Sequence, residues 1–184
     1  MVINSEYMRQ LLLERERFEN PPDYTVKTTG IGIARFIIRC NNNVDEVLNL
    51  SKRVLMIVNF NSELAWPSFE VWSKILPYEF VNNCAPELSK SESEKKIAYR
   101  KSLPWEKQVI LEKNEKWSLG NWLVWLEPDT REWFWWNAHK FNDEIANTHF
   151  LVEVTVLDNP FSSGALKWLF KACGAIDVVS TDDV

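Results

Sequence analysis

A dense aromatic stretch in the second half of the chain limits the possible folds more than any other feature. It holds two apolar runs, Trp-Leu-Val-Trp-Leu (122–126) and Trp-Phe-Trp-Trp (133–136), separated by a Glu-Pro-Asp-Thr-Arg segment. Proline presets φ for the first corner of a turn, and aspartate bonds its own backbone there. Because aromatic side chains fit a pleated, half-buried surface, we predict a β-hairpin formed by residues 121–127 and 131–137.

A third apolar run follows this hairpin. Residues 148–157 place Phe150, Val152, Val154 and Val156 on one face of a strand, because side chains alternate between the two faces. Together with the hairpin, this run predicts an antiparallel three-stranded meander with one apolar face.

Two further strands are predicted in the first half of the chain. Residues 25–40 and 53–60 are rich in strand-forming side chains, and residues 44–51 between them have the spacing of a short helix. The uninterrupted apolar run 54–58 favours a central strand covered on both faces. We therefore expect residues 25–60 to form a small parallel crossover.

Helical spacing marks three other segments. Residues 4–18 form an amphipathic helix whose charged end, 14–17, is expected to be solvated, and residues 68–76 form another. Residues 162–173 form the last helix, which we expect to pack on the meander, with Gly174 placed to end it. A short edge piece follows at residues 176–179.

These elements predict an α+β fold. We expect a single domain over residues 1–184, with a mixed sheet of about five strands, an antiparallel C-terminal meander and helices mainly on one face. Residues 86–116 are rich in Lys, Glu and Ser and are expected to be a polar helical insertion or lid. The acidic tail, residues 180–184, is expected to fray.

Composition and charge argue against several classes of partner. The net charge is −5 and the isoelectric point is near 5.2, whereas binding to phosphate backbones needs clustered Lys and Arg. We find no apolar run of about 18 residues, and therefore expect no membrane span; the first residues lack the pattern of a secretory signal. Three cysteines without a Cys-x-x-Cys spacing, Cys40, Cys84 and Cys173, favour free thiols in a reducing cytoplasm.

The two histidines are the first candidates for catalysis or metal binding. His149 and Glu153 share one face of the predicted third strand, but at about 3.3 Å per residue they lie roughly 13 Å apart. His139 is close in sequence to Asp143 and Glu144. Because no His or Cys motif supplies further ligands, we expect hydrogen-bonded or surface histidines, no metal and no cofactor.

No catalytic motif is present. Gly30-Ile31-Gly32 lacks the third glycine and the following helix of a dinucleotide-binding loop, and no Gly-x-Ser-x-Gly elbow occurs. We therefore name no catalytic residue.

The ten tryptophans are the most unusual feature of the composition. Their ordinary role is to form a large, rigid core, and the alternative is that several line a pocket or an interface. The candidate residues for binding a ligand or a partner are Trp122, Trp125, Trp133, Trp135, His149 and Glu153.

Two functions remain open at this point. We expect a non-enzymatic cytoplasmic protein that binds an unidentified protein or small-molecule partner, and neither nucleic acid nor a membrane. The alternative is an enzyme or small-molecule-binding protein with an aromatic-lined pocket between the sheet and residues 61–116.

Overall fold

The computed structural model describes residues 5–22, 32–63, 65–142, 145–158 and 160–183. Its strands form one antiparallel sheet in the order β2-β3-β1-β4. They are β1 (Gly32–Arg39), β2 (Trp133–Lys140), β3 (His149–Val156) and β4 (Asp177–Ser180). The helices are α1 (Ser5–Glu19), α2 (Val44–Asn61), α3 (Phe69–Ile75), α4 (Tyr78–Asn83), α5 (Lys90–Ser102), α6 (Trp105–Asn114), α7 (Leu119–Val124) and α8 (Gly164–Ala172), followed by the 3₁₀ helix η1 (Thr181–Asp183).

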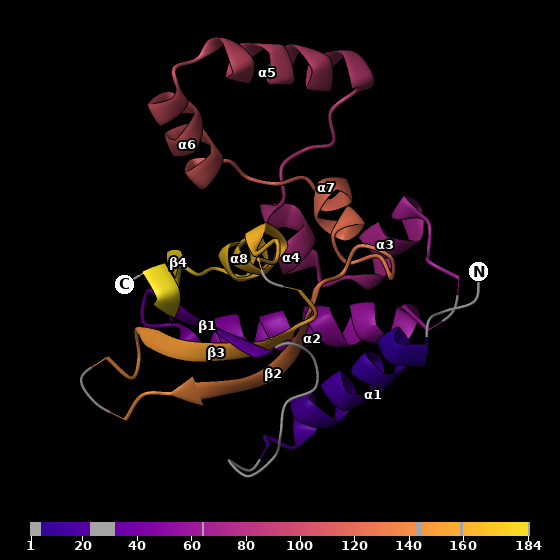
Figure 1. Cartoon of the computed structure of the whole chain (residues 1–184), viewed down its shortest axis with the longest axis vertical. Helices are drawn as coiled ribbons and strands as arrows, with labels where there is room; N and C mark the ends of the chain where they lie inside the picture. The colour runs from indigo at the N-terminus through magenta and orange to yellow at the C-terminus, as the bar shows by residue number, and fades with distance from the viewer. Residues whose placement is uncertain (1–4, 23–31, 64, 143–144, 159, 184) are drawn as a thin grey trace.

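The α+β class is confirmed, and the described sheet differs from the predicted one in two details. Within the described ranges it has four strands rather than about five, and every strand pair is antiparallel rather than mixed. The order β1, α2, β2, β3, α8, β4, with β3 lying between β1 and β2, is the split β-α-β topology. Helices α3 to α7 are inserted between α2 and β2, and α1 precedes this unit (Figure 1).

The predicted strand at residues 53–60 is wrong, because α2 continues through it to Asn61. The buried side chains of α2 recur three or four residues apart, as one face of a helix requires. They include Val44, Val47, Leu48, Ser51, Val54, Leu55 and Val58. Met56 and Ile57 are only partly buried, and their place in an apolar run concealed the helical period. The predicted parallel crossover is therefore absent from the described part of residues 25–60.

The first strand of the predicted hairpin, 121–127, is also wrong. Helix α7 begins after Ser118, whose side chain accepts a hydrogen bond from the backbone N–H of Asn121 (3.3 Å) and so caps the helix. Leu119, Trp122 and Leu123 are buried, which is the spacing of a helix face rather than the alternation of a strand.

The later strands are close to the prediction. The strand predicted at 131–137 begins at Trp133 and extends to Lys140, with an irregularity between Trp135 and Asn137. The strand predicted at 148–157 is confirmed as β3. The strand predicted at 25–40 is confirmed from Gly32, and its earlier part, with Gly30 and Ile31, lies outside the described residues.

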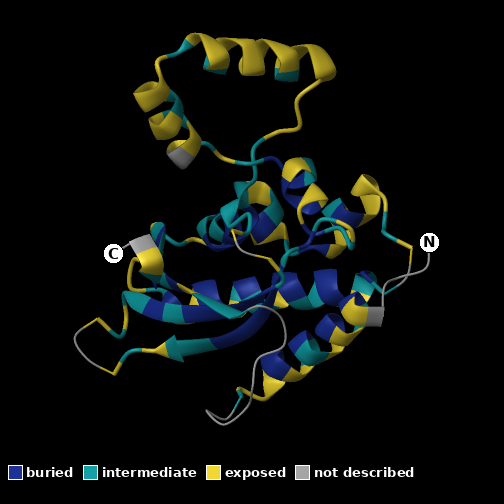
Figure 2. Cartoon of the chain, in the orientation of Figure 1, coloured by how far each residue is buried: buried dark blue, intermediate teal, exposed yellow. Residues whose placement is uncertain are grey.

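The main core lies between one face of the sheet and the helices α2 and α8 (Figure 2). Phe150 of β3 packs edge-to-face on Phe170 of α8, with ring centroids 5.9 Å apart, so the last helix packs on the meander strand as predicted. Gly174 has a φ of +106°, a left-handed conformation that favours glycine, and the backbone N–H of Ala175 donates to the oxygen of Phe170 (2.9 Å). Gly174 therefore ends α8 as predicted.

Helix α1 lies against the outer strand β2 and is held there by a buried carboxylate. Oε1 of Glu14 accepts hydrogen bonds from Arg131 (2.5 Å) and from the backbone N–H of Trp135 (2.7 Å). Its Oε2 accepts one from Asn59 of α2 (2.7 Å). The side chains of Glu14 and Arg131 are both fully buried. Arg17 is also buried, so the prediction that residues 14–17 are solvated is wrong at Glu14 and at Arg17.

Candidate functional site

The tryptophans predicted to line a site lie mostly in the core. Trp122, Trp133 and Trp135 are each exposed by 1% or less. The indole N–H of Trp122 donates to the backbone oxygen of Ala165 (3.0 Å). These three rings fill the space between the sheet and the helices, and none of them lines a cavity described below. Trp125, just after α7, is 39% exposed and does line one of these cavities.

Glu153 lies at the centre of a polar cluster on the sheet face opposite α2 and α8. The strand register places Arg35 and Asn137 on either side of it. Oε1 of Glu153 accepts a hydrogen bond from Nε of Arg35 (2.8 Å), and Oε2 lies 2.9 Å from Nε2 of His139. The amide nitrogen of Asn137 lies 3.1 Å from the same imidazole nitrogen. The cluster therefore links β1, β2 and β3.

The carboxylate of Glu153 orients the imidazole of His139. Oε2 of Glu153 and the amide nitrogen of Asn137 both lie within hydrogen-bond distance of Nε2, so one edge of the ring is held by two neighbours. An oriented imidazole is the form that a general base takes, but the cavities described below are lined by other residues.

His149 does not join this cluster, in agreement with the predicted separation from Glu153. Its Nδ1 lies 2.8 Å from the hydroxyl of Thr148. His139 was missed as the partner because the predicted strand ended at residue 137, which left this histidine beyond the sheet. Extending the strand to Lys140 would have placed residues 137 and 139 on one face, although the register with β3 was not visible. Asp143 and Glu144, close to His139 in sequence, lie outside the described residues.

The second candidate site is a projecting two-helix segment, residues 86–117, which we call the arm. Helices α5 and α6 extend away from the sheet and its covering helices, and nearly all of their surface is exposed (Figures 1 and 2). Ser89 begins α5 with a reciprocal capping box to Glu92, and Pro104 precedes the first residue of α6. Helix α5 buries no residue in the core. Its stability therefore depends on local interactions such as this capping box.

The two ends of the arm meet at one place on the body. The backbone N–H of Ala85 donates to the oxygen of Trp117 (2.9 Å), and Ala85 and Ser118 form an isolated parallel bridge. Glu87 accepts hydrogen bonds from the hydroxyl of Ser118 (2.9 Å) and from the backbone N–H of Gly120 (2.7 Å). These contacts form a short neck, which fixes the base of the arm to the start of α7.

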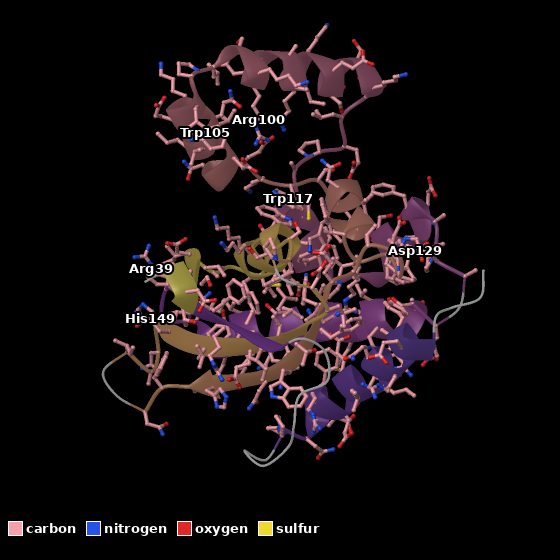
Figure 3. All side chains as sticks on the ribbon, viewed as in Figure 1. Arg39, Arg100, Trp105, Trp117, Asp129 and His149 are labelled. Carbon is pink, nitrogen blue, oxygen red and sulfur yellow. The ribbon has the colours of Figure 1, made fainter. Side chains whose placement is uncertain are left out.

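The arm exposes large apolar side chains. Trp105 is 70% exposed, and Tyr99 and Ile110 are each 61% exposed. Ile97 and Val109 are also exposed on the same two helices. Figure 3 shows Trp105 on α6, far from Arg39 and His149 at the end of the sheet.

Ion pairs connect the parts of the arm to each other. Arg100 of α5 pairs with Glu112 of α6 (2.5 Å), and Lys96 of α5 pairs with Glu115 in the segment after α6. Figure 3 places Arg100 between the two helices. The arm is therefore a defined two-helix unit although its contact with the core is small.

Two cavities lie where the arm meets the body, and Trp117 lines both. The cavity beside α7 has a volume of about 340 Å³ and includes Trp125. The cavity beside α8 and β4 has a volume of about 570 Å³ and includes Val109, Trp168 and Val178. Both volumes fall within the roughly 300–1,000 Å³ of small-molecule sites.

The ring of Trp117 rests on the first residue of α8. A Cβ added at Gly164 would lie 2.9 Å from two ring carbons of Trp117, which is closer than real contacts of this kind. An alanine at this position would have to displace the ring of Trp117, whose packing holds the neck against α8.

The cysteine thiols are poor nucleophiles at neutral pH. Burial raises the pKa of Cys40 to about 11, of Cys84 to about 11 and of Cys173 to about 12, because the thiolate loses its hydration. All three are free cysteines.

Neither a metal site nor a membrane span is found in the described ranges. No group of three His, Cys, Asp or Glu side chains in these ranges has the arrangement to hold a metal ion. No helix among the same residues combines the length and the apolar character needed to cross a bilayer.

Compared with known protein families, with curated proteins and with solved structures, the chain matches none of them.

Proposed function

We propose that this protein binds another protein through the arm, and that binding rather than catalysis is its role. The supporting observation is the exposure of Tyr99, Trp105 and Ile110 on a segment that projects from the core. Isolated apolar side chains on a surface are ordinary, but several large ones on one protruding unit mark an interaction site. Tyrosine and tryptophan are also the residues most enriched where binding energy concentrates in interfaces.

The neck supports the same proposal. Because both ends of the arm are held at Ala85 and Trp117, the arm is presented in a defined orientation rather than as a loose loop. Orientation fixed before binding reduces the conformational entropy that association would otherwise lose.

Affinity capture with arm variants tests this proposal. Wild-type protein is expected to retain a partner that the double variant Tyr99→Ser/Trp105→Ser loses. Tyr78→Ser is the matched control, because Tyr78 is an equally exposed aromatic residue on α4, away from the arm. Circular dichroism checks that all variants are folded. A partner retained equally by wild type and by the arm variant would contradict the proposal.

A second candidate function is small-molecule binding in the larger cavity at the base of the arm. Its volume of about 570 Å³ and the rings of Trp117 and Trp168 in its wall favour this alternative. The cavity lies between the arm, α8 and β4 rather than against the open sheet face. Quenching of tryptophan fluorescence by a metabolite library, lost in Val109→Trp, which fills the cavity, would support it. No quenching by any compound would contradict it.

We also infer that the protein acts in a reducing compartment such as the cytoplasm. Three unpaired cysteines, two of them buried, support this placement. Detection of the protein in an oxidising compartment by fractionation would contradict it.

A further inference from the structure

The charge of the chain is divided unevenly between the arm and the rest. Residues 86–117 contain eight of the 21 Lys and Arg residues and six of the 26 Asp and Glu residues, a net charge of +2. The rest of the chain therefore has a net charge of −7, which together with the +2 of the arm gives the total of −5. The segment that projects furthest is thus the positive part of an acidic protein.

Internal contacts use several of the arm's acidic side chains. Glu112 and Glu115 are paired with Arg100 and Lys96. Glu87 accepts hydrogen bonds from the neck. Glu92 accepts them from the backbone and hydroxyl of Ser89.

Several exposed lysines of the arm, by contrast, form no ion pair among the described residues. Lys90, Lys95, Lys101 and Lys107 are exposed, and none has an ion pair within the described part of the chain. Glu94 and Glu106 are the exposed acidic residues that remain beside them. The outer surface of the arm consequently carries an excess of positive charge.

Three of the exposed apolar side chains, Ile97, Tyr99 and Ile110, have one of these lysines a helical turn away, and for Ile110 it is Lys107, three residues before it. Lys95 precedes Tyr99 by four residues, and Lys101 follows Ile97 by four. Residues three or four apart are neighbours on a helix surface. A partner that covers one of these apolar side chains therefore meets an ammonium group at its edge.

A shallow groove on α6 combines the same two features. It has a volume of about 220 Å³ and is lined by Leu103, Ile110 and Leu111, with Lys107 and Asn114 beside them. The apolar part suits one large aliphatic or aromatic side chain, and Lys107 suits a carboxylate next to it.

A membrane surface fits these features less well. Helices that lie in a bilayer carry one continuous apolar face, whereas Ile97 and Tyr99 are two residues apart and point about 200° away from each other around α5. Nucleic acid also fits less well, because Glu94, Glu106 and Glu112 would lie among the phosphates.

We propose that the arm's partner is a protein surface on which acidic side chains surround one or two large apolar side chains. This inference rests on the proposed function, since it assumes that the arm is the binding element. The lysines provide the long-range attraction, and the exposed apolar residues provide the buried contact.

Synthetic peptides test the charge requirement with the full-length protein. Three helical peptides share the same Leu and Phe anchors and carry Glu, Gln or Lys at the flanking positions, and binding is followed by fluorescence anisotropy of a label on the peptide. The Glu peptide is expected to bind most tightly, and its affinity is expected to fall as salt concentration rises.

Charge reversal on the arm provides the matching variant. Lys95→Glu/Lys101→Glu/Lys107→Glu is expected to weaken the Glu peptide by about tenfold or more, since three exposed charge pairs are lost and reversed. Lys74→Glu is the control, because Lys74 is an exposed lysine on α3 of the body.

Separate outcomes distinguish the two proposals. If the Gln or Lys peptide binds as tightly as the Glu peptide, and Tyr99→Ser/Trp105→Ser abolishes that binding, the acidic partner is wrong and arm binding stands. If the arm variants change binding of no peptide, the acidic partner is overturned, and affinity capture alone decides the proposed function.

Further measurements test the other classes of partner that could occupy the arm. Tighter binding to vesicles containing phosphatidylglycerol, or to single-stranded oligothymidine, would overturn the inference in favour of a lipid or a nucleic acid. A dimer detected by sedimentation velocity and removed by the triple reversal would identify a second copy of this chain as the occupant, and would overturn the inference of a different protein.

Discussion

Glu14 and Arg131 have opposite charges that are buried together, although the sequence places Glu14 in a charged helix end. The position of Glu14 follows from tertiary structure: α1 turns this side chain toward β2, where Arg131 and the backbone of Trp135 meet it. Arg131 also lies over the ring of Phe134 at 4.4 Å and donates through Nε to the oxygen of Trp133 (3.0 Å). One carboxylate therefore joins α1, α2 and β2.

Removing Arg131 is expected to destabilise the protein strongly. Arg131→Met leaves the carboxylate of Glu14 buried without its ionic partner, which costs about 3–5 kcal/mol of the free energy of unfolding. Urea denaturation followed by circular dichroism measures this loss.

A surface pair is the control for this prediction. Arg53 and Glu79 form an exposed pair at 3.4 Å, and Arg53→Met is expected to cost at most about 1 kcal/mol. Equal losses in the two variants would contradict the view that burial makes the Glu14–Arg131 pair indispensable. The double variant Glu14→Leu/Arg131→Met is expected to recover part of the stability, because no buried charge then remains unpaired.

Sequence patterns also failed to predict the partner of Glu153. The strand and the face of this residue were predictable from alternation along β3. Its contact with His139 depends on a register between β2 and β3 that includes an irregularity at Trp136, and no local pattern determines that register. Cross-strand partners of this kind are the part of a site that a single sequence reveals least.

Among the secondary-structure elements, the successful and failed predictions have a common physical cause. α1, β3 and α8 have a clear period or a clear cap, and they were predicted to within a few residues. The second half of α2 and the run 122–126, which begins in α7, are mostly apolar and lack alternating polar residues. In such runs β propensity and helical packing compete, and the neighbouring elements decide the outcome. The second half of α2 is helical because Val54, Leu55 and Val58 continue the buried face that begins at Val44.

The contact between α8 and the neck gives a prediction for a single glycine. Gly164→Ala is expected to push the ring of Trp117 away, since the new Cβ would lie 2.9 Å from it. We expect a loss of about 1–3 kcal/mol in the free energy of unfolding, although alanine is otherwise the better helix former. The change in tryptophan emission reports the displacement of the ring.

Gly32→Ala is the matched control for this substitution. No atom lies within 4 Å of a Cβ placed at Gly32, so alanine is expected to be neutral or slightly stabilising there. If Gly164→Ala behaved in the same way, the close packing of Trp117 would not be holding the neck.

For the molecule as a whole, the buried thiols set a limit on stability at alkaline pH. Burial raises the pKa of Cys173 from 9.0 to about 12 and that of Cys40 from 9.0 to about 11. A raised thiol pKa contributes stability that is complete below pH 9 and is lost as the pH rises toward these values, because the unfolded chain releases its protons first. Partial burial lowers the pKa of Lys52, and this shift acts in the opposite direction.

Stability is therefore expected to fall between pH 9 and pH 11. Urea midpoints measured under reducing conditions across this interval test the expectation, and Cys173→Ala is expected to show a shallower decline than wild type. Iodoacetamide is expected to label the native thiols about a hundredfold more slowly than the unfolded chain near pH 8, from the thiolate fraction alone. Rapid labelling of the native protein would contradict the raised pKa values.

The two ends of the sheet differ in how they are covered. β2 is covered by α1 through the contacts of Glu14, whereas β4 is a short outer strand that pairs with β1 alone. Alternation along β3 was enough to predict one face of this sheet. The coverage of its edges depends on segments far away in the sequence and was not predicted.

The neck between Ala85 and Ser118 makes the length of the arm independent of the rest of the architecture. Since the chain leaves and re-enters the body at one hydrogen-bonded bridge, lengthening, shortening or exchanging the two helices shifts no strand pairing and opens no void in the core. Insertions and sequence drift are tolerated best at such positions. Homologues of this chain should consequently vary most in this segment and least in β1 and β3. The specificity of recognition should evolve in the arm without new demands on folding.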